Sequence, residues 1–200
     1  PPLVYILNKF LNPFFGDFEK YRLVVFLISL SGPIFFYKFL TIKFHFVDKK
    51  ILFLLASVIY LSPYYRTSGY WALNENYSIV MMSLSFLFLE KFLKFENNVL
   101  KNILFVIFFS SLTVYFDQKF LIVPIVCFFS IMFKKIIIKY KLITLLIYSI
   151  LSLPYVYLIY RWNGIVPPAT QLANPNTITS IGDIKNLYFM HIGYSATLIS

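Results

Sequence analysis

The sequence predicts an all-α protein built as a bundle of transmembrane helices, and three observations lead to this prediction. Of the 200 residues, 60% are hydrophobic and only 13% are charged, which is too apolar for a soluble domain of this size. The hydrophobic residues form runs that short polar turns separate. Eleven of the fifteen lysines lie on every second turn, in the stretches 38–50, 91–101 and 134–141. This alternation is typical of a chain that crosses a bilayer repeatedly and keeps its lysine-rich loops in the cytoplasm.

The apolar runs predict seven spans that follow an interfacial helix. Residues 1–20 mix apolar and polar side chains, so we expect a short helix that lies on the membrane surface. The first span covers 22–40, and Gly32-Pro33 should bend it. The other spans are expected at 51–65, 77–89, 103–116, 120–133, 142–160 and 187–200.

Several of these runs are short for a membrane span. Thirteen to fifteen residues give about 20 Å of helix, whereas the hydrocarbon core is about 30 Å thick. Bordering tyrosines and lysines can extend each helix into the interface. The alternative is that 51–65 and 77–89 form one re-entrant hairpin.

Charge and composition narrow the possible partners. The formal net charge of +10 is mostly lysine beside apolar runs, which indicates a topogenic signal and attraction to anionic lipids rather than nucleic-acid binding. Cys127 is the single cysteine, so an intrachain disulfide is excluded and packing is its expected role. The chain begins at Pro1 without an initiator methionine and stops at Ser200 inside an apolar run, so we expect a fragment.

The loops opposite the lysine-rich ones carry the candidate site. All three arginines lie there, and the stretch 64–76 combines Arg66 and Glu75 with tyrosines and a tryptophan. A guanidinium can bind a phosphate with two parallel hydrogen bonds, which a lysine cannot do. The alternative is an ordinary aromatic belt with a topogenic arginine.

Two further segments on this side contain polar residues suited to a sugar phosphate. Asp117 and Gln118 are candidates for contacts to a sugar, with Lys119 beside a phosphate. The alternative is a tight turn in which the aspartate bonds the local backbone. The segment Arg161-Trp162-Asn163 follows the span 142–160, and its tryptophan either anchors the helix or stacks on a sugar ring.

Motifs of soluble enzymes are absent from the sequence. It contains no phosphate-binding GxxxxGK[ST] loop, GxGxxG, GxSxG or HExxH pattern. His45 and His191 are far apart in the sequence, so no metal site is predicted, and no cofactor is expected.

The pattern resembles the GT-C superfamily of polytopic membrane glycosyltransferases. The likeness lies in Pro1-Pro2-Leu3 before an Arg22-led span, and in Glu75 just ahead of a span. It also lies in the turn 117–120, which is similar to an Arg-Gln turn of the dolichyl-phosphate-glucose-dependent members, and in the Trp-Asn-Gly segment 162–166. This chain has Asp117 in place of the arginine and Pro167-Pro168 in place of a glycine-and-aspartate continuation.

The resemblance implies transfer of a sugar from a polyprenyl-phosphate donor at the external or lumenal membrane face. It implies Glu75 and Asp117 as carboxylates for the acceptor, and it places the principal catalytic carboxylate upstream of Pro1. The phosphate and sugar contacts implied are Arg66, Gln118, Lys119, Arg161, Trp162 and Asn163. The expected location is the plasma (inner) membrane, or the endoplasmic reticulum in a eukaryote. The alternative function is a non-enzymatic flippase or transporter subunit for lipid-linked sugars.

Overall fold

The computed structural model describes residues 3, 10, 18–70, 74–95 and 97–162, and all of the regular structure in this part of the chain is helical. The chain divides into two compact units, Pro1–Ser152 and Leu153–Ser200, and each is described by itself. The helices are α2 (Phe18–Lys43), α3 (Lys49–Leu61), α4 (Pro63–Tyr70), α5 (Asn74–Lys94), α6 (Val99–Phe116), the 3₁₀ helix η1 (Gln118–Leu121), α7 (Ile122–Phe133) and α8 (Ile138–Trp162).

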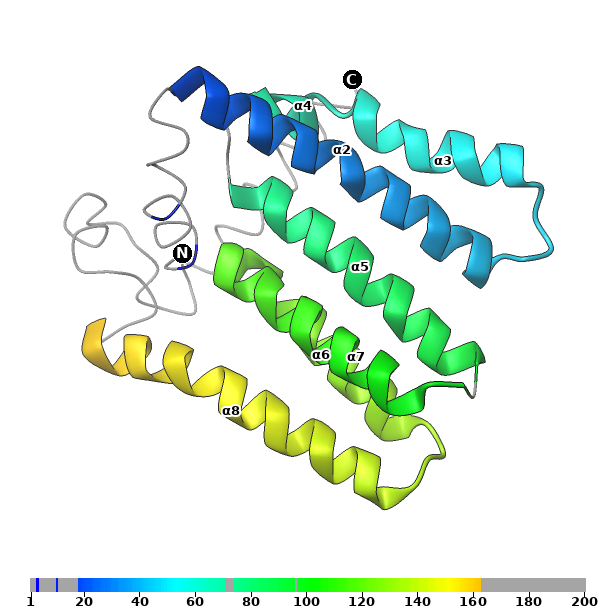
Figure 1. Ribbon diagram of the computed structural model, residues 1–200, viewed down its shortest axis with the longest axis vertical. Coiled ribbons are helices and arrows are strands. Elements are labelled where there is room, and N and C mark those ends of the chain that lie inside the picture. The colour runs from blue at the N-terminus through cyan, green and yellow to red at the C-terminus, as the bar shows by residue number, and fades with distance from the viewer. Residues whose placement is uncertain (1–2, 4–9, 11–17, 71–73, 96, 163–200) are drawn as a thin grey trace, which may run out of the picture. The chain divides into compact units, whose positions relative to one another are not determined.

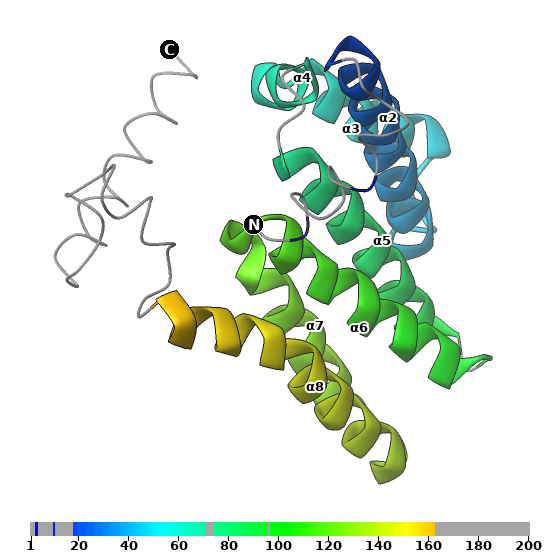
Figure 2. The ribbon, with the colours of Figure 1, turned by 60° about the vertical axis from the view of Figure 1, so that its left-hand side comes forward.

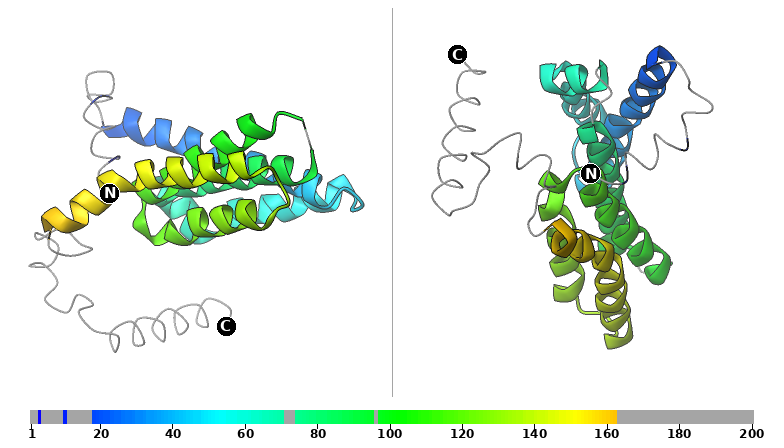
Figure 3. Two further views of the ribbon diagram at one scale, coloured as in Figure 1. Left: turned by 90° about the horizontal axis from the view of Figure 1, so that it is seen from below. Right: turned by 90° about the vertical axis from the view of Figure 1, so that its left-hand side faces the viewer.

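The long helices of the first unit run side by side in alternating directions (Figures 1 and 3). Helix α2 lies between α3 and α5, and α6 follows on the other side of α5. The alternative of one re-entrant hairpin formed by 51–65 and 77–89 stays a prediction. Figure 2 shows the short helix α4 beside the ends of α2 and α3.

Within the described residues, three helices are long and apolar enough to cross a membrane: Glu19–Lys43, Val99–Phe116 and Ile138–Arg161. They contain the predicted spans 22–40, 103–116 and 142–160. The predicted spans 77–89 and 120–133 are also helical, within α5 and within η1 followed by α7. The prediction for 187–200 lies outside the described residues.

The predicted span 51–65 was wrong at its end, because α3 stops at Leu61 and a new helix begins at Pro63. Ser62 has an extended ψ of 119°, as expected for a residue that precedes proline. Its hydroxyl accepts a hydrogen bond from the backbone N–H of Tyr65 at 3.4 Å, so Ser62 caps α4 and Pro63 occupies the first helical position. Residues 63–70 are therefore helical, where the sequence predicted the end of a span and a loop.

The interfacial helix predicted within 1–20 stays a prediction, because most of these residues lie outside the described ranges. Residues 18–20 already belong to α2. Of the rest, only residues 3 and 10 are described, and Leu3 packs against the buried cluster of Val25, Tyr77 and Phe116.

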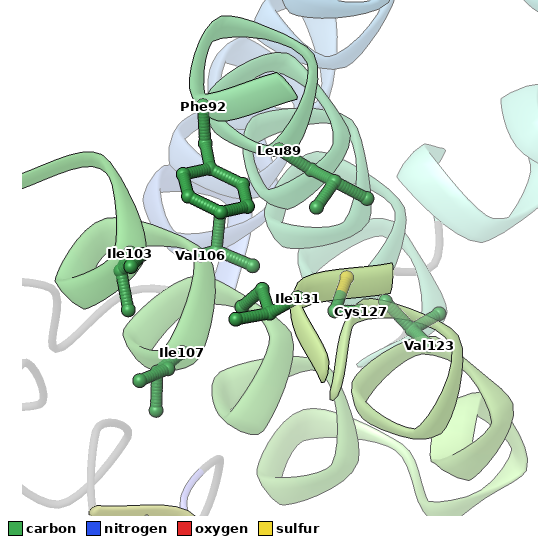
Figure 4. Packing of buried hydrophobic residues seen from close by; sticks show 8 residues of the cluster. All are labelled: Leu89, Phe92, Ile103, Val106, Ile107, Val123, Cys127 and Ile131. Atoms are coloured by element: carbon green, nitrogen blue, oxygen red, sulfur yellow. The ribbon is translucent and has the colours of Figure 1, made fainter. Parts of the chain in front are cut away.

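The main core lies where α5, α6 and α7 meet (Figure 4). Its buried members are Leu89, Phe92, Ile103, Val106, Ile107, Val123, Cys127 and Ile131. Cys127 is fully buried here, as expected for a packing role. By contrast, α3 buries only Leu52 and Ala56; most of its other apolar side chains are exposed, and Ile59 and Tyr60 are half-buried. A helix that is apolar all round is typical of a hydrocarbon environment.

Lysine side chains connect neighbouring helices at one end of the bundle (at the right in Figure 1). This end carries the connections from α2 to α3, from α5 to α6 and from α7 to α8. Glu90 is buried and pairs with Lys43 at 3.3 Å and with Lys94 at 3.7 Å. Lys94 also donates to the last carbonyls of α2, and Lys134 donates to the carbonyl of Leu93 at 2.8 Å. These ammonium groups satisfy carbonyls that a helix C-terminus leaves without a partner.

Candidate functional site

Glu75, Asp117 and Lys119 form one charged cluster in the first unit. The Nζ atom of Lys119 lies 3.3 Å from Oε1 of Glu75 and 4.0 Å from Oδ2 of Asp117. Glu75 and Asp117 have mostly buried side chains, with exposed fractions of 17% and 10%, whereas that of Lys119 is 70% exposed. The structure therefore brings together three of the predicted site residues from two separate segments.

Local backbone chemistry places each member of the cluster. Glu75 lies in the first turn of α5, where the helix dipole favours a negative charge. Asp117 ends α6 in an extended conformation, and its Oδ1 accepts the backbone N–H of Lys119 at 3.0 Å. This bond is the tight-turn interaction that the sequence offered as the alternative for Asp117. The carboxylate thus begins η1 and also faces the lysine ammonium.

Burial and the charges of the cluster shift the pKa of Lys119 and of Tyr64. Burial acts to lower the pKa of Lys119, but attraction to Asp117 and Glu75 outweighs it, so this pKa is raised. The pKa of Tyr64, on α4, is also raised, first by burial and then by the negative charge of Glu75.

A buried polar network holds α4 and α5 in place around Glu75. The Asn76 amide nitrogen donates to the Ser29 hydroxyl at 2.9 Å and to the backbone carbonyl of Tyr65 at 3.2 Å. Asn76 is 1% exposed, and Gly69 packs directly against its amide. Sequence reasoning missed Asn76 as a site-building residue, although an amide at the start of an apolar span is a signal for a buried polar contact.

Arg66 and Gln118 are exposed and lie outside the ion-paired cluster. Arg66 is on α4, and no ion pair connects it to another residue in the described part of the first unit. Gln118 is the first residue of η1, directly beside Asp117. The predicted roles of both side chains in binding a donor remain predictions.

The other predicted contacts belong to the end of α8 or lie beyond it. Arg161 is exposed in the last turn of α8, within the second unit. The side chain of Trp162 and all of Asn163 lie outside the described residues. The predicted role of Arg161 in contacting the donor stays a prediction.

The cluster has the composition of an acid–base site. Two carboxylates face one ammonium, so one negative charge is uncompensated among these three groups. Within the described ranges, no three histidine, cysteine, aspartate or glutamate side chains gather in a way that could hold a metal ion. The groups present are suited to hydrogen-bonding a hydroxyl and to accepting its proton.

Comparisons with models of protein families, with curated proteins and with solved structures find no match to this chain. The function must therefore be inferred from the chemistry of its own residues.

Proposed function

We propose that the protein is a membrane glycosyltransferase that moves a sugar from a polyprenyl-phosphate donor to an acceptor hydroxyl. The observation that carries this proposal is the contact of Lys119 with Glu75 at 3.3 Å, beside the buried carboxylate of Asp117. An acid–base cluster at the ends of apolar helices suits a reaction between a lipid-anchored donor and a polar acceptor. The resemblance to the GT-C superfamily supports the same chemistry.

Glu75 is the better candidate for the carboxylate that contacts the acceptor. Asp117 is the more buried of the two, and one of its oxygens accepts the backbone N–H of Lys119. That hydrogen bond occupies Oδ1 of Asp117 in the turn that begins η1. Glu75 keeps partial exposure, so an acceptor hydroxyl can reach its carboxylate, as a general base requires.

The two carboxylates beside Lys119 make the arginines better candidates than this lysine for binding the donor phosphate. A phosphate that approached Lys119 would also meet the two carboxylates that flank it. Arg66 is exposed, lies outside this ion-paired cluster and offers a planar fork of donors. Arg161 is the second candidate, as the sequence predicted.

The proposed step is a displacement at the anomeric carbon of the sugar. The acceptor hydroxyl gives its proton to the Glu75 carboxylate while its oxygen forms a bond to that carbon. The bond from the carbon to the phosphate oxygen breaks, and its electron pair leaves with the polyprenyl phosphate. A guanidinium stabilises the negative charge that develops on this leaving group.

A transfer assay on the full chain in proteoliposomes tests the proposal. The probes are polyprenyl-phosphate sugars with a radiolabelled sugar, supplied with a membrane extract as the source of acceptors. Glu75→Gln should lower kcat at least tenfold, whereas Glu19→Gln, an exposed carboxylate in the first turn of α2, should not. Arg66→Lys should raise the KM for the donor several-fold, because the two-bond phosphate contact is lost.

Two outcomes would contradict the proposal. Equal turnover by Glu75→Gln and the unaltered chain would remove Glu75 from the reaction. If the intact labelled donor crosses the bilayer and no sugar is transferred, the result contradicts an enzyme and favours the flippase alternative.

A further inference from the structure

A hollow of about 350 Å³ lies between α7 and the part of α8 that belongs to the first unit (Figure 2). The residues that line it recur every three to four positions on each side, so one face of each helix forms a wall. The residues that define its length are Leu121, Ile125 and Phe129 on one wall and Leu145, Ser149 and Ser152 on the other. Because the two helices run in opposite directions, the hollow continues along both of them for about 12 Å.

A tyrosine keeps the two walls apart. The ring of Tyr148 packs edge-on against Phe128 of α7, with ring centroids 5.8 Å apart, and both residues border the hollow. The Tyr148 hydroxyl lies within hydrogen-bonding distance of the Ser110 hydroxyl of α6, at 2.8 Å. Helix α8 cannot move closer to α7 without displacing this ring and breaking that bond. The hollow is therefore a fixed part of the packing.

The hollow is apolar and open on one side. Leu121, Ile125, Phe129 and Leu145 are each about half exposed. In a membrane, the open side of these apolar helices faces hydrocarbon. A lipid chain can then enter the hollow from the bilayer without passing through water.

One end of the hollow adjoins the charged cluster. Leu121 is the last residue of η1, and Lys119 precedes it by two positions. Two residues of a 3₁₀ helix rise about 4 Å, so this end of the hollow lies within one turn of Lys119. Lys119 in turn lies 3.3 Å from Glu75. A lipid whose reacting group lies at Glu75 therefore has the hollow close by for its chain.

We propose that this hollow binds the polyprenyl chain of the sugar donor. The isoprene units next to the phosphate lie between Leu121 and Ser152, and the chain continues past Phe129 into the bilayer. A chain held in a fixed groove would limit the positions of the anomeric carbon relative to Glu75. The proposal rests on the proposed transfer reaction, because that reaction places the head of the donor at the cluster.

Photolabelling of the full chain in proteoliposomes tests this site without requiring turnover. The probe is polyprenyl phosphate with a diazirine in the isoprene unit next to the phosphate, and mass spectrometry of peptides locates the label. We expect the label within 121–129 and 145–152. Phosphatidylglycerol with a diazirine in an acyl chain, at the same concentration, should label these segments at least fivefold less. Equal labelling by the two probes would overturn the assignment to a polyprenyl chain.

Two tryptophan substitutions at neighbouring positions of α8 provide a matched pair. Ser149→Trp places a large ring in the hollow and should reduce labelling by the polyprenyl probe at least fivefold. Ile150→Trp adds the same ring at an exposed position that does not line the hollow, and it should be labelled like the unaltered chain. Equal labelling of the Ser149→Trp and Ile150→Trp variants would refute the site.

Failure of this site and failure of the proposed reaction give different results. Sugar transfer by a chain that is not labelled within 121–129 or 145–152 would overturn the chain site and leave the proposed function standing. Labelling of these segments without transfer from any polyprenyl-phosphate sugar would support the chain site and contradict the proposed function.

Discussion

The hydroxyl of Tyr65 donates a hydrogen bond to the backbone carbonyl of Ser29, although the two residues are 36 positions apart. Pro33 lies four residues after Ser29 within α2 and has no N–H to donate to that carbonyl. Tyr65 therefore satisfies the group that the proline leaves without its helical partner. In a hydrocarbon environment such a carbonyl must find a donor within the protein, so α4 becomes part of what makes α2 stable.

Gly32→Ala should destabilise the protein through this bond. A β-carbon at position 32 would lie 2.8 Å from the Tyr65 hydroxyl oxygen, so the ring must shift away from Ser29. We expect a loss of about 2 kcal/mol in the free energy of unfolding, measured by denaturant titration in detergent micelles. In a Tyr65→Phe background, the same substitution should cost less, because the clashing oxygen is absent. Additive effects of the two substitutions would contradict this explanation.

Glu75→Gln should lower the pKa of Lys119. The pKa of this lysine is raised from its ordinary 10.5 because attraction to Asp117 and Glu75 outweighs burial. The ion pairs therefore stabilise the fold fully below pH 10.5, and this contribution disappears as the pH rises through the higher folded value. NMR titration of ¹³C-methylated lysines measures the shift. The resonance of Lys139, assigned from its loss in Lys139→Arg, serves as the control. If the pKa of Lys119 is the same in Glu75→Gln and in the unaltered chain, Glu75 does not contribute to the raised pKa.

Removal of both lysines that face Glu90 should destabilise the protein more than removal of Glu90. The carboxylate is buried, so Lys43→Met with Lys94→Met leaves its charge uncompensated, at a cost of about 3–5 kcal/mol. Glu90→Leu leaves two lysines that can reach solvent and should cost less. Unfolding in detergent micelles compares the variants. A larger loss for Glu90→Leu would show that the carboxylate is needed for more than neutralising the lysines.

Impermeant thiol labelling should distinguish the two ends of the bundle. In cells, cysteines at Asn74 and Gln118 should react from outside, whereas cysteines at Lys49 and Asn97 should react only after permeabilisation. The same is expected for Gln171 outside and Lys139 inside. The unaltered chain is the control, since its Cys127 is buried. Reaction of both sets from one side would contradict the alternating topology.

The hydrophobic runs and the lysine pattern were sufficient to predict the helical fold of the described residues and the approximate positions of their long helices. In a bilayer, an apolar segment of this length must satisfy its own backbone hydrogen bonds and therefore forms a helix, so the prediction needed no knowledge of packing. The sequence Ser62-Pro63 is itself typical of a helix start, with a capping serine followed by a proline in the first turn. The prediction extended the span past this point because Tyr64 and Tyr65 are aromatic residues that suit the end of a span.

The candidate site was only partly predictable. The sequence indicated Glu75, Asp117 and Lys119 because polar residues between apolar runs are conspicuous. It did not predict the ion pair between α5 and η1, nor the role of Asn76 in joining α5 to α2 and α4. Those contacts depend on how helices distant in the sequence rotate and pack against one another, whereas the composition of each segment alone determined that it is helical and apolar.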